Sequence, residues 1–453
     1  MRAAVTALLL CAPALTFAQA QQPPQASGPL TLPQLQELAR QNDPRTAMAR
    51  AQVENAQGKR DEVRWSLFPK FETQVAVAGP TPEARFTKPP PRSLTDVTEG
   101  CWFCGDLGIG VGANVNMVMP IYTFGKYTAG KAATDHLVGA MSALLQRAYD
   151  QATFDVTRAY WGYQTARGAR ETVVQVRSRI AEARQRGQKL LAEQSDQISK
   201  SDLMKIDYLA EEIEARTAEA NKNAALAITG IRLLVGKGPQ EPLDIAQQEL
   251  PQPPPQPHED EVLRRALERR PEARAAAEQV AARRAALDVE RAKLYPDLAL
   301  VGGATFNYTS SADDPRTPFA YNPYNQRSAY VALGLLVTFD IPQKLARIRQ
   351  AEADLHDAMA QQRGAESLVR LDVRQALGDL DEARQRVLRY TSQSNIGKQL
   401  AVQAGLAFDS GLGEARELLE DVLLWSRADG EKFKALFDAQ IAWAALQKAT
   451  GGL

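Results

Sequence analysis

The 453-residue chain offers few side chains to catalysis or metal binding. Two of its 3 cysteines form the motif Cys101-Trp-Phe-Cys104. This spacing suits a redox centre, half of a metal site or a short structural disulfide. A thioredoxin-like centre requires the motif where a strand meets a helix, whereas Cys101 and Cys104 lie in a Pro/Gly-rich loop before an expected strand. We expect a disulfide that stiffens this loop in an oxidising compartment.

Other chemistry has little support. The 3 histidines, His136, His258 and His356, lie far apart in the chain, so a complete zinc site is not expected. No histidine lies near a plausible nucleophile, and no glycine-rich phosphate loop opens a helix. We therefore predict no enzymatic activity, no cofactor and no metal. The 54 basic and 54 acidic residues give a net charge of zero, which argues against nucleic acid as a partner.

The first twenty residues have the pattern of a secretory signal peptide. Arg2 precedes the apolar stretch 3–17, and Ala18-Gln19-Ala20 matches the small-x-small cleavage site. A buried N-terminal helix is the alternative. We expect cleavage before Gln21, and no later window reaches the ~18 apolar residues of a membrane-spanning helix. If the exported chain enters a membrane, we expect it to do so as β-structure.

The distribution of prolines predicts two long helical regions. No proline lies between Pro120 and Pro239, and none follows Pro342, although the chain has 26 prolines. A helix over residues 344–407 would be ~95 Å long. Within it, residues at alternating steps of four and three form a coiled-coil seam with two polar positions. The seam comprises Leu355, Met359, Gln362, Glu366, Val369, Val373, Ala376, Leu380, Ala383 and Val387.

Two pairs of strands separate these helices from shorter ones. Residues 71–77 alternate between apolar and polar side chains, and residues 107–117 alternate apolar side chains with glycine and asparagine. Residues 298–308 and 330–339 repeat the pattern. Apolar residues on one face and small polar ones on the other are typical of a transmembrane barrel, although a half-buried strand of a soluble sandwich shares the alternation.

The chain contains an internal duplication. Pro44 aligns with Pro271, and Phe68-Pro69 aligns with Tyr295-Pro296 at the same offset of 227 residues. We predict a first repeat over 21–246, with a β-hairpin at 66–124 and a helical hairpin at 126–236. A Pro-rich linker, 247–258, leads to a second repeat over 259–453, with a β-hairpin at 297–340 and a helical hairpin at 343–449. The predicted fold class is mainly α with membrane β-structure.

Four strands per chain cannot close into a membrane barrel, because the smallest such barrels use about eight strands. Open sheet edges are not tolerated in lipid, so the chain must oligomerise through its sheet. Two copies would give eight strands and little lumen. Three copies would give twelve strands and room for a passage.

This duplicated order of helix, two strands, long helix, turn and helix, with the strand starts at Phe68-Pro69 and Tyr295-Pro296 and the signal peptide, resembles the TolC-type outer-membrane efflux channel family. The resemblance covers essentially the whole mature chain. It implies a homotrimer in outer-membrane lipid, with a twelve-stranded β-barrel and a periplasmic α-barrel. It also implies a periplasmic adaptor protein, an inner-membrane pump of the RND or ABC type, and export of drugs or other small molecules.

The two hairpin turns carry the residues that the family places at the periplasmic opening. The stretch 408–420 resembles the second turn, and the resemblance implies that Glu417 and Glu420 form an acidic ring. The alternative is a solvated helical face. At the first turn it implies that Ser201 and Asp202 restrain opening, although Ser201 could instead cap the helix.

The second turn also contains two glycines, and at two positions its residues differ from those of the family. Gly411 and Gly413 are expected at the hairpin tip. Gly413 stands where some members carry a closing arginine, and Phe408 stands where they carry tyrosine. We therefore favour the acidic ring over any particular latch and leave open whether Arg416 or Lys200 substitutes.

Two rival functions remain at this point. The exit duct of a type I protein secretion system would share the same architecture. A periplasmic coiled-coil adaptor or structural spacer is a different class of protein, and the duplicated strand pairs with apolar outer faces argue against it.

Overall fold

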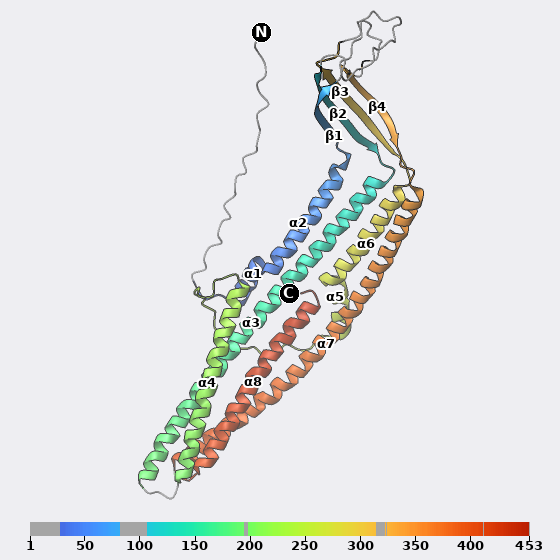
Figure 1. Cartoon of the computed structure of the whole chain (residues 1–453). Helices are drawn as coiled ribbons and strands as arrows, with labels where there is room; N and C mark the ends of the chain where they lie inside the picture. The colour runs from blue at the N-terminus through green and yellow to red at the C-terminus, as the bar shows by residue number, and fades with distance from the viewer. Residues whose placement is uncertain are drawn as a thin grey trace, which may run out of the picture.

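The computed structural model describes residues 28–81, 107–193, 198–313, 322, 324–410 and 412–452. The chain forms an elongated body with a sheet at one end and long helices that extend away from it (Figure 1). The predicted signal peptide, both cysteines of the Cys101–Cys104 pair and Gly411 lie outside the described residues. No described helix combines the length and apolar character that crossing a membrane requires.

The order of elements repeats once along the chain, which confirms the predicted duplication. The first repeat contains α1 (Leu32–Asn42), α2 (Pro44–Arg64), the short 3-10 turn η1 (Trp65–Leu67), β1 (Lys70–Thr81), β2 (Gly108–Tyr122), α3 (Lys126–Ala192) and α4 (Lys200–Leu234). The second contains α5 (Glu259–Arg269), α6 (Pro271–Ala292), β3 (Asp297–Thr309), β4 (Arg327–Leu336), α7 (Ile341–Asp409) and α8 (Ala415–Ala449).

Proline fixes equivalent breaks in the two repeats. Pro44 and Pro271 each stand at the first position of a helix, where the missing N–H costs nothing. The preceding residues, Asp43 and Arg270, are extended, as expected before proline. Some predicted boundaries differ from the structure. Strand β4 ends at Leu336 rather than near Phe339, since the chain must turn before α7 begins, and α7 begins at Ile341 rather than at residue 343.

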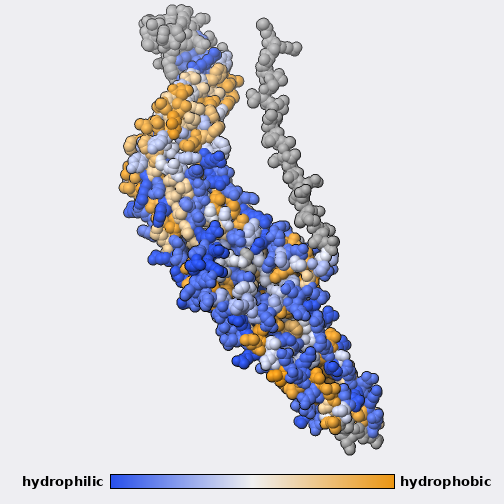
Figure 2. Space-filling model, turned by 180° about the vertical axis from the view of Figure 1, so that it is seen from behind, coloured by the Kyte–Doolittle hydropathy of each residue, from blue (hydrophilic) through white to orange (hydrophobic). Residues whose placement is uncertain are grey.

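The four strands form one antiparallel sheet in the order β1-β2-β3-β4. The register aligns Val75 with Ala113 and Ala113 with Phe306, so apolar side chains share one face. Most large side chains of this face are exposed, and Figure 2 shows hydrophobic residues gathered over the sheet. On the other face Gln74, Asn114 and Thr305 are aligned. The predicted separation of an apolar face from a polar one is confirmed, and both β1 and β4 are edge strands.

The helical body is organised by α3 and α7, which have 67 and 69 residues. The predicted seam of α7 is buried from Val369 to Val387 and packs against α8. Its two polar positions, Gln362 and Glu366, are half-buried, and the Gln362 amide donates a hydrogen bond to the Glu366 carboxylate at 3.4 Å. The long helix with coiled-coil packing is therefore confirmed.

Candidate functional site

The two helical hairpins, α3/α4 and α7/α8, end side by side at the end of the molecule farthest from the sheet (Figure 1). One hydrophobic cluster holds both ends together, with Ile180 of α3, Ile206 of α4, Phe408 of α7 and Trp425 of α8 among its buried members. Because this cluster draws on all four helices, the two tips are positioned as one unit.

The second tip, between α7 and α8, is a tight turn. The backbone N–H groups of Leu412 and Gly413 both donate to the carbonyl oxygen of Ala407, at 2.9 and 3.0 Å. A Cβ at Gly413 would lie 2.9 Å from the Ala407 Cβ and 3.0 Å from the Phe408 nitrogen, so the close approach requires glycine. Phe408 is only 2 % exposed, so this aromatic ring forms part of the tip core.

The first tip is closed by a capping box. The hydroxyl of Ser199 accepts from the Asp202 backbone N–H at 3.1 Å, and the Asp202 carboxylate accepts from the Ser199 backbone N–H and hydroxyl. These bonds, the one from the Ser199 hydroxyl first, hold the pKa of Asp202 below its ordinary value. The idea that Ser201 caps α4 is wrong, because α4 begins at Lys200 and the Ser199 side chain occupies the cap position. Ser201 is exposed on the first turn of the helix.

An arginine that sequence reasoning did not select links the two tips. The Arg186 guanidinium, on α3, donates to the backbone carbonyl of Asp409 at the end of α7, and its Nε lies 3.9 Å from the Asp409 carboxylate. Both side chains are largely exposed. Periodicity along α3 gives no sign of this contact, because it depends on how the two hairpins pack. Of the two candidates left open, Arg416 lies 3.9 Å from Glu414 of its own turn, and Lys200 is exposed.

The acidic residues predicted at the opening are exposed. Glu417 lies in the first turn of α8, and Glu420 follows three residues later. Residues three apart on a helix lie on the same side, so the two carboxylates project together from the second tip.

Above the tips, a buried carboxylate joins three helices. Asp429 of α8 accepts hydrogen bonds from Thr172 of α3 at 2.5 Å, Ser394 of α7 at 2.7 Å and Lys432 of α8 at 2.6 Å. Thr172, Ser394 and Asp429 are each less than 10 % exposed. This cluster ties the first hairpin to the second in the part of the helical body between the sheet and the tips, which we call the wall.

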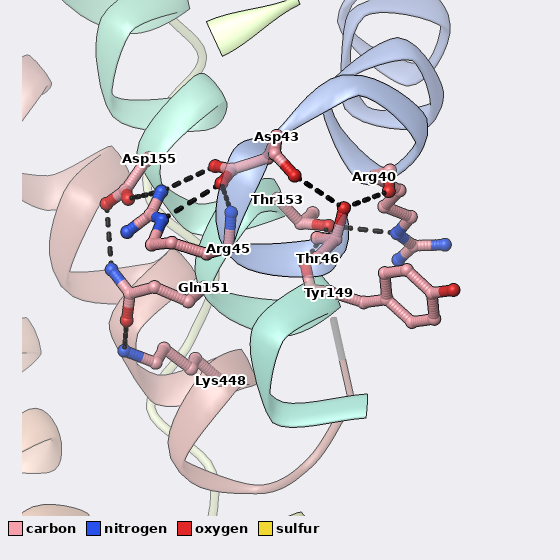
Figure 3. Close-up of polar contacts among 9 residues, drawn as sticks. All are labelled: Arg40, Asp43, Arg45, Thr46, Tyr149, Gln151, Thr153, Asp155 and Lys448. Carbon is pink, nitrogen blue, oxygen red and sulfur yellow. Dashed lines mark hydrogen bonds and ion pairs between the residues drawn. The ribbon is translucent and has the colours of Figure 1, made fainter. Parts of the chain in front are cut away.

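A further polar network lies where the short N-terminal helices meet α3 and the end of α8 (Figure 3). Arg45 donates to Asp43 and to Asp155 of α3, both at 2.7 Å. The Gln151 side-chain amide donates to Asp155 at 2.8 Å, and the Lys448 ammonium donates to the side-chain oxygen Oε1 of Gln151. The network therefore fixes the break between α1 and α2 to the long helix α3.

The equivalent break in the second repeat, between α5 and α6, has a similar ion pair with the two charges exchanged. Asp43 aligns with Arg270 and Arg45 aligns with Glu272 at the offset of 227. Arg270 contacts Glu272 at 3.1 Å and Asp372 of α7 at 2.6 Å. In both repeats, an ion pair across the first residues of the second helix is anchored to the long helix of the same repeat.

No group of three or more His, Cys, Asp or Glu residues that could hold a metal occurs within the described ranges. The arrangement consists of an apolar-faced sheet, long helices and two joined tips.

Comparison with known proteins bears directly on this arrangement. Residues 262–452, which comprise nearly the whole second repeat, match the family described as outer membrane efflux protein. The second repeat is therefore similar in sequence to that family, and the duplication gives the first repeat the same order of elements. The resemblance predicted from the sequence is thus confirmed, as is an outer-membrane location.

Solved structures share the fold at low sequence identity. The outer-membrane channel OprN is 21% identical with a TM-score of 0.73, and the alignment covers 93% of this chain and 90% of that one. VceC from Vibrio cholerae is 17% identical with a TM-score of 0.71, covering 93% and 96%. MtrE of Neisseria gonorrhoeae, solved in an open state, is 18% identical with a TM-score of 0.71, covering 93% and 89%. No significant match was found among curated proteins.

Proposed function

We propose that three copies of this chain form a conduit that carries drugs or other small molecules across the outer membrane. The observation that carries the proposal is the sheet, which has an exposed apolar face and two edge strands, β1 and β4. An unpaired edge is not tolerated in lipid, so β4 of one copy would pair with β1 of the next. Three copies would close a twelve-stranded barrel with a polar interior.

The helical body would continue this barrel as a tunnel into the periplasm. The long helices α3 and α7 begin where strands β2 and β4 end, so a passage through the barrel would continue between the helices (Figure 1). A conduit of this kind has no energy source of its own. We infer that a periplasmic adaptor protein and an inner-membrane pump drive transport through it.

The joined tips would form the closed periplasmic end. In a trimer, Glu417 and Glu420 would occur three times around the axis, and a ring of carboxylates favours cations. Asp202, held in its capping box, and Gly413, held against Ala407, would keep each tip in its closed shape.

Single-channel conductance in planar bilayers tests the proposal. We expect the purified wild type to show a small cation-selective conductance, and the Glu417→Ala/Glu420→Ala variant to lose the selectivity. A matched control is Asp379→Ala/Glu382→Ala, which removes two exposed carboxylates with the same spacing from the middle of α7.

The outcomes separate the two parts of the proposal. If the selectivity changes equally in both double variants, the protein is a channel, but Glu417 and Glu420 do not form its selective ring. Failure of a folded protein to insert into bilayers would overturn the conduit itself.

A further inference from the structure

A groove lies at the junction of the sheet and the helices. It has a volume of about 510 Å³ and lies between the start of α3 and the end of α6. The α3 side is formed by Phe124, Gly125, Thr128 and Ala129, and the α6 side by Asp288, Arg291, Ala292 and Tyr295. The groove thus combines aromatic rings with one cation and one anion.

The aromatic side of the groove continues the apolar face of the sheet. Tyr122 aligns with Leu298, which aligns with Leu335 of the exposed apolar face. The Tyr122 ring meets Phe124 edge-on at 4.7 Å, and Phe124 stacks on Tyr295 at 6.4 Å. All three rings are more than a third exposed. Exposed tyrosine and phenylalanine at the end of an apolar band are typical of a membrane boundary.

Two carboxylates surround the one guanidinium of the groove. Arg291 contacts Glu352 of α7 at 3.0 Å and lies 3.9 Å from Asp288, so one guanidinium faces two carboxylates. A guanidinium has five N–H donors, which leaves capacity for another acceptor beside Glu352. A ligand with one anionic group alone would add negative charge here. A ligand that also brings a cation would complement both Arg291 and Asp288.

The duplication repeats the same residue types in the first repeat. At the offset of 227, Asp61, Arg64, Phe68 and Pro69 align with Asp288, Arg291, Tyr295 and Pro296. Phe68 also contacts a second exposed aromatic ring, that of Trp65, at 6.2 Å. Each repeat therefore carries an acid, an arginine and an aromatic residue where its second helix leads into its first strand.

We propose that the groove binds the head group of a zwitterionic phospholipid with a primary ammonium, phosphatidylethanolamine. Arg291 donates to the lipid phosphate, as guanidinium groups do to phosphates. The ammonium pairs with Asp288 and lies over the rings of Phe124 and Tyr295, where cation–π attraction adds to the ion pair. The acyl chains then follow the apolar face of β2 and β3. The site rests on the proposed function only in placing the groove at the membrane boundary.

Native mass spectrometry of the full-length protein in detergent tests the site. Equal amounts of phosphatidylethanolamine and phosphatidylglycerol are added, and the lipid retained by the wild type and by Arg291→Gln is counted. We expect the wild type to retain phosphatidylethanolamine preferentially, and Arg291→Gln to bind it about tenfold more weakly because a charge-assisted hydrogen bond is lost.

A matched control and a second variant make the result specific. Arg283→Gln removes another exposed arginine of α6, which pairs with Asp354 of α7 at 3.1 Å much as Arg291 pairs with Glu352. We expect this variant to bind like the wild type. Asp288→Asn should shift the preference toward phosphatidylglycerol, because the partner of the ammonium is lost.

Two results would overturn the site: equal retention of both lipids by the wild type, or equal binding by the Arg291→Gln and Arg283→Gln variants. Circular dichroism of each variant verifies folding. The measurement in detergent requires no conduction, so failure of the lipid site and failure of the conduit are distinguishable.

Discussion

The wall of the helical body and its tips are held by different kinds of polar contact. In the wall, the buried Asp429 carboxylate accepts from three side chains on three helices. At the tips, the exposed Arg186 reaches a backbone carbonyl and lies 3.9 Å from the Asp409 carboxylate. Burial makes the first contact costly to break, whereas exposure to water and salt makes the second weak. The structure therefore combines a buried polar contact in the helical wall with an exposed one at the tips.

Removal of the buried carboxylate tests the buried side of this comparison. We expect Asp429→Ala to destabilise the protein by about 2–4 kcal/mol, because Thr172, Ser394 and Lys432 lose their shared acceptor in a buried site. Asp429→Asn retains an acceptor oxygen and should cost less. Urea unfolding of the detergent-solubilised protein, followed by circular dichroism, measures the change.

The tip provides the control for this measurement. Asp409→Ala leaves in place the backbone carbonyl that Arg186 contacts and removes only a 68% exposed carboxylate. Its cost should lie within about 0.5 kcal/mol. An equal loss of stability in Asp429→Ala and Asp409→Ala would remove the distinction between wall and tip.

The pKa of Asp429 gives this prediction a pH dependence. Burial raises the pKa, but the hydrogen bonds from Lys432, Thr172 and Ser394 and the charge of Lys432 outweigh it and hold the pKa below its ordinary value of 3.8. A carboxyl with a lowered folded pKa stabilises the fold above its unfolded pKa and loses that contribution as pH falls through the folded pKa. The advantage of the wild type over Asp429→Asn should therefore be constant near neutral pH and shrink below pH 3.8.

The wall was more predictable from sequence than the tip. Proline spacing and the steps of four and three located the long helices and the buried seam from Val369 to Val387, because helical periodicity is a local property of the chain. Alternation likewise gave the two faces of the sheet. The contacts of Arg186 and Asp429 join residues 223 and 257 positions apart, and only the packing of the hairpins brings them together. The cap at Ser199 was missed by two residues, since Ser199 and Ser201 both precede helical sequence.

An intermediate effect is expected where the second tip turns most tightly. Gly413→Ala would place a methyl group 2.9 Å from the Ala407 Cβ and 3.0 Å from the Phe408 nitrogen. The backbone must then shift, at a cost of about 1–3 kcal/mol. Gly430→Ala is the control, because a Cβ there meets nothing within 4 Å. A thermal unfolding series of the two variants tests the difference, and equal unfolding temperatures would show that the turn adapts freely.

The smallest effect on stability, and the most informative for gating, is expected from Arg186→Ala. The substitution removes the hydrogen bond from α3 to the Asp409 carbonyl, yet Arg186 is 44% exposed, so the cost should stay below about 1 kcal/mol. If this bond restrains the tips, the conductance of the variant in planar bilayers rises while its urea midpoint hardly moves.

Charge alone would also alter conductance, and Arg179→Ala separates the two causes. Arg179 is an exposed arginine of the same helix that pairs with Glu182 of α3 rather than with the second hairpin. A rise in conductance confined to Arg186→Ala would assign the effect to the link between the tips. The same rise in Arg179→Ala would make it an effect of charge. The two tips would then be held together by the packing around Phe408 rather than by the hydrogen bond of Arg186.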